Sequence, residues 1–238
     1  AMAAAEIVNI VNHDSDTLSL LDLSIHSVRD CDNSINVLSC GDGDLSYSIA
    51  LIRSLVALYP TKSIKFIATC FLEGDSLRET HPEAENNIKD LEQFSNCEVK
   101  TGVDATQLHT LFEFSYFDRI VWNFPQHPER RKIHRHRELL KQFFASASSR
   151  LNEHGQVWVT LKGGQGGSGA ELQEFVRPWS NTWQIQEHAA NSGLVLAAVS
   201  EANIDCLIKA GYRSVGFRNS DRSFFTKGSL IHVFTTAN

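Results

Sequence analysis

An acidic glycine turn, Gly41-Asp42-Gly43-Asp44, is the stretch of this sequence whose residue types are best suited to holding a ligand. It follows a mostly apolar run, 35–40, and precedes Leu45, Ile49 and Ile52 at helical spacing, which predicts a strand, a turn and a helix. Glycine lets the backbone approach a ligand, and the helix points its first free N–H groups into the same space. Two aspartates would repel a phosphate but suit hydroxyls and positive charge, so S-adenosylmethionine fits better than ATP or NAD. The alternative is a tight turn with Asp44 as the helix N-cap.

Three later apolar runs are also followed by polar or loop-forming residues. These following segments are 70–73, 104–106 and 123–127. Ligands of open parallel sheets bind outside the carboxyl ends of the strands, so we expect these segments to meet at one edge. Asp104 either accepts a hydrogen bond from an adenine amino group or only caps the helix that starts near Thr106.

The segment after the fourth predicted strand is more specific. Asn123 and a backbone stiffened by Pro125 can present acceptors to a planar N–H group, as a methyl acceptor requires. The alternative is a turn that merely ends the strand.

A basic stretch at 129–138 holds five Arg or Lys and two His in ten residues, although the whole chain has a net charge of −6. Its cations Arg130, Arg131, Lys132 and Arg135 suit phosphate contacts from RNA. A solvated first half of a helix is an equally simple interpretation. Lys162 and the glycine-rich loop 163–169 either close over a substrate or form only a flexible connection, and no P-loop signature accompanies them.

Composition limits the class of protein. The 238 residues suffice for one large α/β domain, and five scattered cysteines without a CxxC pair favour reduced thiols over a disulfide scaffold or a zinc site. No apolar run is long enough to span a membrane. We therefore expect no metal and no membrane partner, and a cytoplasmic or nuclear, including nucleolar, location.

Strands and helices alternate along the chain, which predicts an α/β fold with a mostly parallel sheet and helices on both faces. A helix is expected at 75–95, and another at 131–152 with Gly155 as its terminating glycine. A further helix is expected near 170–178 or beyond. We expect one domain at 35–238, with 1–34 as an extension packed on it. The expected strands are 35–40, 63–70, 98–103, 117–122, 156–161, 194–199 and 230–234.

Five motifs fall in the order and spacing of a known family: Gly41–Ser48, Ala68-Thr69-Cys70, Gly102–Thr106, Phe117–Pro125 and Val159-Thr160-Leu161-Lys162. They resemble the Rossmann-like domain of the yeast-type large-subunit rRNA uridine-N3 methyltransferases (the BMT5-like family). Later motifs, including Ala210-Gly211-Tyr212-Arg213-Ser214, are more similar to its ferredoxin-fold anticodon-binding domain-containing protein 1 branch. The resemblance covers roughly residues 35–235.

The resemblance implies a class I, seven-stranded, S-adenosylmethionine-dependent methyltransferase that acts on RNA, either rRNA or tRNA. It implies the methionine part of the cofactor at 41–46, the adenine near 104–106 and the acceptor base near 123–126. The branch's anticodon-binding domain lies outside this chain. The implied cofactor-binding residues are Gly41, Asp42, Gly43, Asp44, Ser46, Cys70, Phe71, Glu73, Asp104, Ala105, Thr106 and Asn123.

Two positions depart from the family pattern. Leu72 stands where the family has an acid after the second strand, so ribose binding either relies on the neighbouring Glu73 or is lost. Gln126, followed by His127, stands where the family has a His after Asn-Phe-Pro. Our hypothesis is methyl transfer to a ring nitrogen of an RNA base, and N3 of uridine is the first candidate for that nitrogen. Asn123 orients the ring, Pro125 stiffens the loop and His127 takes the proton. The alternatives are a non-catalytic RNA- or tRNA-binding module and a small-molecule methyltransferase.

Overall fold

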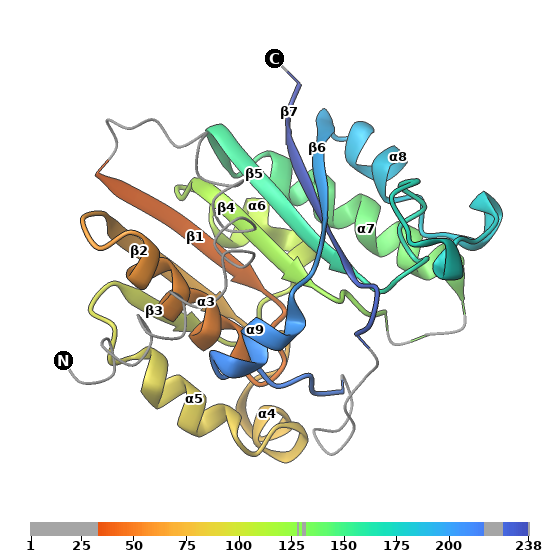
Figure 1. The fold of residues 1–238 in the computed structure, drawn as a ribbon. Helices are drawn as coiled ribbons and strands as arrows, with labels where there is room; N and C mark the ends of the chain where they lie inside the picture. Colours follow the sequence, from red (N-terminus) through yellow and green to blue (C-terminus); the bar gives the residue numbers. More distant parts are fainter. Residues whose placement is uncertain (1–32, 128, 130–131, 217–225, 238) are drawn as a thin grey trace. The chain divides into compact units, whose positions relative to one another are not determined.

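The computed structural model describes residues 33–127, 129, 132–216 and 226–237 (Figure 1). Within these residues seven strands form a sheet in the order β3-β2-β1-β4-β5-β7-β6. Strand β7 is antiparallel to β5 and to β6, so the sheet is mixed but mostly parallel, as the sequence predicts. The chain separates into two compact units, 1–102 with 203–224 and 103–202 with 225–238.

The first unit holds three parallel strands, which pair in the order β3-β2-β1. Apolar side chains of β1 such as Ile35, Val37 and Leu38 are at most 1% exposed, and α3 lies against β2 with α9 packed beside it (Figure 1). The elements are β1 (Ser34–Cys40), α3 (Ser46–Leu58), β2 (Ser63–Thr69), α4 (Gly74–Thr80), α5 (Ala84–Leu91), β3 (Cys97–Lys100) and α9 (Ile204–Lys209).

Backbone hydrogen bonds join the loops that follow these three strands. Asp42 N donates to Thr69 O over 3.0 Å, and Cys70 N donates to Lys100 O over 3.2 Å. Gly102 N donates to Leu72 O over 3.3 Å. The loops after β1, β2 and β3 therefore lie together at one edge of this unit, where parallel-sheet ligands bind.

The second unit is built around helix α7, which packs against β5, α6, α8 and the turn η1. Its inner face is apolar at helical spacing, and Leu140, Phe143 and Phe144 are fully buried. The elements are η1 (Ala105–Gln107), α6 (Leu108–Leu111), β4 (Phe117–Asn123), α7 (Ile133–Ser148), β5 (Leu151–Leu161), η2 (Gln173–Phe175), η3 (Trp179–Asn181), α8 (Ile185–Ala190), β6 (Leu194–Glu201) and β7 (Leu230–Thr236).

Two expected helices differ from the structure. The helix expected at 75–95 is two helices, because Pro82 lacks the N–H that would continue the first one after His81. The helix expected at 131–152 ends at Ser148, and Gly155 lies inside β5. A Cβ at Gly155 would lie 2.7 Å from the carbonyl oxygen of Phe117, so this glycine permits an irregular pairing with β4 and caps no helix.

Segment 170–178 contains a 3-10 turn, η2, and the next α-helix is α8. The extension expected at 1–34 lies outside the described residues except for its last two positions. None of the described helices is long and apolar enough to cross a membrane.

Candidate cofactor and RNA site

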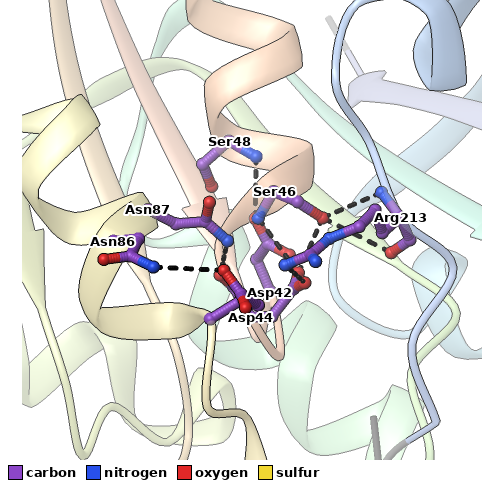
Figure 2. Close-up of polar contacts among 8 residues, drawn as sticks. Asp42, Asp44, Ser46, Ser48, Asn86, Asn87 and Arg213 are labelled. Carbon is purple, nitrogen blue, oxygen red and sulfur yellow. Dashed lines mark hydrogen bonds and ion pairs between the residues drawn. The ribbon is translucent and has the colours of Figure 1, made fainter. Parts of the chain in front are cut away.

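Both aspartates of the glycine turn bind the N-terminus of α3 (Figure 2). Asp42 Oδ2 accepts a hydrogen bond from Ser48 N at 2.7 Å. Asp44 Oδ1 accepts from Ser46 N at 3.1 Å and from Ser46 Oγ at 2.6 Å. The N–H contact of Asp44 agrees with the capping alternative, although the N-cap position itself is Leu45, at φ 66°. Two carboxyl groups thus lie where the helix dipole favours negative charge.

Asp42 has an unusual acidity for a carboxyl group. Burial, and secondarily the charge of Asp44, raise its pKa to about 7, although hydrogen bonds from Ser48 act in the opposite direction. At neutral pH the protonated and the ionised forms of the half-buried Asp42 are therefore both populated. A cationic ligand group beside it would favour the ionised form.

A distant segment, 212–215, contacts the same turn. Arg213 Nη2 lies 3.0 Å from Asp44 Oδ2, and Arg213 N donates to Ser46 Oγ over 2.9 Å (Figure 2). The Tyr212 ring meets the Tyr47 ring edge to face, with centroids 5.8 Å apart. The sequence indicates no contact between Arg213 and this turn, because 169 positions separate it from Asp44. Its only signal was its place in a family motif.

The loop after β2 brings an aromatic ring and a carboxylate to the same edge. Phe71 is 55% exposed, which is unusual for so large an apolar side chain. A Cβ built on Gly102 would lie 2.5 Å from Glu73 Oε2, so the Glu73 carboxylate lies over the backbone that follows β3. Cys70 Sγ contacts Leu72 O at 3.1 Å, and burial raises the pKa of this thiol to about 12, so it stays neutral.

In the second unit, Asn123 ends β4 and is fixed by β5. The Thr160 hydroxyl donates to Asn123 Oδ1, and Phe124 N donates to Thr160 O over 2.8 Å. Phe124 has a positive φ of 49°, a strained value for a residue with a side chain, and Pro125 is buried. The turn after β4 therefore has a fixed, strained backbone of the kind found at ligand sites.

His127 lies in this turn and is anchored on α7. Its Nδ1 accepts from Glu129 N over 3.1 Å, and its backbone N–H points at His136 Nδ1, 3.4 Å away. The buried His136 ring stacks on Trp183 with centroids 4.2 Å apart. Because Nδ1 of His127 is an acceptor here, a neutral ring carries its hydrogen on Nε2.

Asp104, Ala105 and Thr106 form the start of η1. Asp104 Oδ1 accepts from Thr106 N at 2.9 Å and from Thr106 Oγ1 at 2.7 Å. The capping alternative for Asp104 is therefore confirmed. Its contact with adenine stays a prediction, and so do those of Ala105 and Thr106.

Two cations of the basic stretch share one carboxylate. Lys132 Nζ and Arg135 Nε each lie 2.9 Å from an oxygen of Glu129, and both side chains are about half exposed. Hydrogen bonding from Lys132 is the main reason that the pKa of Glu129 falls below its ordinary value. Arg130 and Arg131, the other two predicted RNA contacts, lie outside the described residues.

The glycine-rich loop after Lys162 is pinned by Glu171. Its carboxylate accepts from the backbone N–H groups of Gly167, Ser168 and Gly169 at 2.8, 3.1 and 3.0 Å. The half-buried Lys162 donates its backbone N–H to Gln165 Oε1 over 3.1 Å. Glu171 thus ties the loop by hydrogen bonds, and both expectations for it, closure over a substrate and a flexible connection, stay predictions.

No group of three or more His, Cys, Asp or Glu in the described part of the chain is arranged to hold a metal ion.

The sheet order, and the glycine turn between β1 and α3, define a class I methyltransferase fold. The family model described as BMT5-like, rRNA (uridine-N3-)-methyltransferase BTM5-like, matches residues 38–207, and the chain belongs to this family.

Curated relatives and solved structures agree with this family and fold. Ferredoxin-fold anticodon-binding domain-containing protein 1 of Homo sapiens is 36% identical over 84% of this chain, but the chain spans only 30% of that relative. Heavy metal-associated isoprenylated plant protein 41 of Arabidopsis thaliana is 31% identical over 67% of this chain and 29% of its own length.

Two solved structures share the fold at low identity. The 16S rRNA methyltransferase KamB has a TM-score of 0.52 at 14% identity, covering 86% of this chain and 88% of its own. The N-methyltransferase NodS from Bradyrhizobium japonicum, in complex with S-adenosyl-L-homocysteine, has a TM-score of 0.51 at 12% identity, covering 92% and 85%.

Proposed function

We propose that this chain is an S-adenosylmethionine-dependent RNA methyltransferase that modifies a base nitrogen, with uridine N3 of rRNA as the first candidate. The observation that carries the proposal is the acidic glycine turn at the N-terminus of α3, in a chain of the BMT5-like family. The turn presents carboxylates where a phosphate-binding turn presents bare N–H groups. It therefore favours a ligand with positive charge and hydroxyls.

The chemistry of the first unit fits this cofactor. Asp42, whose pKa is raised by burial, suits the cofactor's ammonium group, and Glu73 suits the ribose hydroxyls in place of the acid missing at Leu72. The exposed Phe71 ring offers a face for adenine. Gly41, at φ 60°, has a backbone conformation that suits glycine, and we propose Gly43, Asp44, Ser46 and Cys70 as further cofactor contacts. A Cβ at Gly43 would lie 3.1 Å from His81 Nε2, so the His81 ring already occupies one side of the turn. Asp104, Ala105, Thr106 and Asn123 remain the further cofactor residues that we propose.

S-adenosylmethionine held by the glycine turn 41–44 and by Glu73 would supply a methyl group to the base nitrogen and would leave as S-adenosylhomocysteine. The N3 proton of the base would pass to the protein. Little covalent chemistry falls to the protein, so most of the acceleration comes from holding acceptor and donor in line.

We assign the orientation of the base to Asn123. The Asn123 oxygen that we expected to accept from the base N–H already accepts from the Thr160 hydroxyl. The remaining group of this side chain is its amide nitrogen, a donor that suits a uracil carbonyl oxygen. The strained Phe124 and the buried Pro125 hold the turn in this conformation.

His127 is the residue that we propose as proton acceptor. Its Nδ1 accepts from Glu129 N, so it takes the N3 proton at that atom once the Glu129 contact opens. The nearby cations of the basic stretch (Lys132, Arg135 and their neighbours Arg130 and Arg131) and Lys162 are our proposed contacts with RNA phosphates.

A non-catalytic RNA- or tRNA-binding module is the second candidate. Leu72 replaces the usual acid and Gln126 replaces the usual His, and the His127 acceptor atom is already engaged. A protein that keeps the fold without turnover would tolerate all three features.

Transfer of a labelled methyl group tests the proposal against this alternative. RNA from cells lacking the protein is incubated with the purified protein and methyl-labelled S-adenosylmethionine, digested, and analysed as nucleosides by mass spectrometry. We expect label in one methylated base, with 3-methyluridine first, and at least a hundredfold less label with Asn123→Ala. RNA binding without label from a folded protein would support the binding module instead.

A further inference from the structure

We propose that Arg213 binds the α-carboxylate of the cofactor's amino-acid part, and that the Asp44–Arg213 pair together with Asp42 forms a receptor for a zwitterion. This assignment rests on the proposed cofactor. It adds a residue that no sequence motif identified as a ligand contact.

The argument begins with charge. The glycine turn offers two carboxylates, which suit an ammonium group but repel the carboxylate bonded to the same carbon of the ligand. Arg213 places a guanidinium 3.0 Å from Asp44 Oδ2 at that turn. In α3 the described cation is Arg53, which lies 3.9 Å from Asp90 of α5. The buried His81 also lies beside the turn, but burial lowers its pKa, so Arg213 is the lasting counter-charge there.

Burial gives the two partners different roles. Asp44 is 1% exposed, whereas the Arg213 side chain is 49% exposed. A guanidinium has five N–H donors in a planar fork, and such a fork binds carboxylates in bidentate geometry. Asp44 thus holds one side of the fork from within the protein, and the solvent side suits a second carboxylate.

The Arg213 backbone is held independently of its guanidinium. Arg213 N donates to Ser46 Oγ over 2.9 Å, and the neighbouring Tyr212 is 6% exposed and packs on Tyr47. A Cβ built on Gly43 would lie 3.5 Å from Val215 Cγ2, so the same segment also approaches the middle of the turn. Removing only the guanidinium should therefore leave the segment in place.

The two aspartates then have separate tasks. Asp44 is neutralised by Arg213, while Asp42 accepts from Ser48 N and is left for the ammonium group. The positive and negative receptors both contact the first turn of α3, at Ser46 and Ser48 (Figure 2). Neighbouring charges of opposite sign are what the ammonium and carboxylate of an amino acid require.

Ligands that differ in the carboxylate test the assignment. Affinities of wild type, Arg213→Ala and Arg213→Lys are measured by calorimetry for S-adenosylhomocysteine, decarboxylated S-adenosylmethionine and 5′-methylthioadenosine. We expect Arg213→Ala to weaken S-adenosylhomocysteine by roughly 10- to 100-fold and the two ligands without a carboxylate by less than about threefold. Arg213→Lys should keep part of the affinity.

Arg53→Ala is the matched control, because Arg53 lies in the same unit and its guanidinium approaches Gly211, next to this segment. It should change no ligand's affinity by more than about twofold. Thermal melting verifies that each variant is folded.

Three results would overturn the assignment. Equal weakening of all three ligands would make Arg213 a positioning residue of the turn, and unchanged affinity for S-adenosylhomocysteine would remove it from the site. Both results leave the proposed cofactor intact. A folded wild type that binds none of the three ligands would instead refute the proposed function and this assignment with it.

Discussion

Asp42 is the residue whose ionisation links the stability of the protein to its proposed ligand. Its pKa is raised by burial from an ordinary 3.8 to about 7, so the folded protein binds a proton more tightly than the unfolded chain does. Stability from this group is therefore present below pH 4 and lost as pH rises to about 7.

Asp42→Asn should make the ligand-free protein more stable at pH 8, by roughly 1–3 kcal/mol, and this gain should shrink toward pH 4. Asparagine keeps an oxygen to accept from Ser48 N and carries no charge to desolvate. Denaturant unfolding at several pH values measures the difference. Equal stability of variant and wild type at pH 8 would show that Asp42 is not destabilised by burial.

The same group predicts a pH-dependent affinity for S-adenosylmethionine. An ammonium group favours the ionised form of Asp42, so binding should release a proton and strengthen by up to about tenfold per pH unit between pH 5.5 and 7. Calorimetry in two buffers of different ionisation enthalpy counts the protons. Affinity independent of pH in this window would exclude Asp42 as the partner of the ammonium group.

Variants of Asn123 and Thr160 separate two effects: the contact of Asn123 with the base, and the orientation of the Asn123 side chain by Thr160. Asn123→Ala should lower kcat by about 10²- to 10³-fold, because the variant has no fixed hydrogen-bonding group at the acceptor. Thr160→Val removes only the hydroxyl that orients Asn123 and should cost about tenfold. Single-turnover rates on a confirmed RNA substrate measure both. Full activity of Asn123→Ala would refute its role.

At the scale of elements, the N-terminal part of α7 and the turn before it carry the proposed RNA contacts. Removing one cation that binds a phosphate of single-stranded RNA should make the slope of log affinity against log salt shallower by about 0.7. Lys132→Ala and Arg135→Ala should each make the salt slope shallower by this amount. Glu129→Gln should raise the affinity for RNA, because it releases both Lys132 and Arg135 from their ion pairs. Filter binding from 50 to 200 mM salt measures the slopes.

Lys141→Ala is the control for these variants, because Lys141 lies farther along the same helix, 3.9 Å from Glu138. It should leave the salt slope unchanged. Identical slopes for Lys132→Ala, Arg135→Ala and wild type would place the RNA elsewhere on the protein.

The sequence predicted an element correctly where the residues that determine its structure are adjacent in the chain. The turn 41–44 was predicted because its glycines, its acids and the helical spacing after it are adjacent in sequence. The break at Pro82 also has a local signal, which the helical pattern on either side obscured. Gly155 was misinterpreted because the carbonyl that requires it belongs to Phe117, on another strand.

Contacts between distant segments could not be predicted. Nothing near Arg213 in the sequence indicates that its guanidinium pairs with Asp44 or that its N–H binds Ser46. Likewise Thr160 fixes Asn123 only because β4 and β5 pair in the register that sets these two residues opposite each other. The sequence predicted the candidate residues, and the structure added the partners that orient them.

At the scale of the whole molecule, the fold and the family agree with the residue chemistry. The strand order is that of class I methyltransferases, and the family model spans residues 38–207, from β1 to α9. The chain spans only 30% of the human ferredoxin-fold anticodon-binding domain-containing protein 1. The substrate and the partners given for this chain are therefore proposals.

We propose that the acidic glycine turn selects a sulfonium cofactor and rejects a phosphate. Calorimetric titration of the folded wild-type protein at pH 7.5 with S-adenosylmethionine, and separately with ATP, measures this selection. We expect one bound S-adenosylmethionine per chain and no detectable heat of binding with ATP at about 1 mM. Binding of ATP, or no binding of S-adenosylmethionine by protein that melts cooperatively, would contradict it.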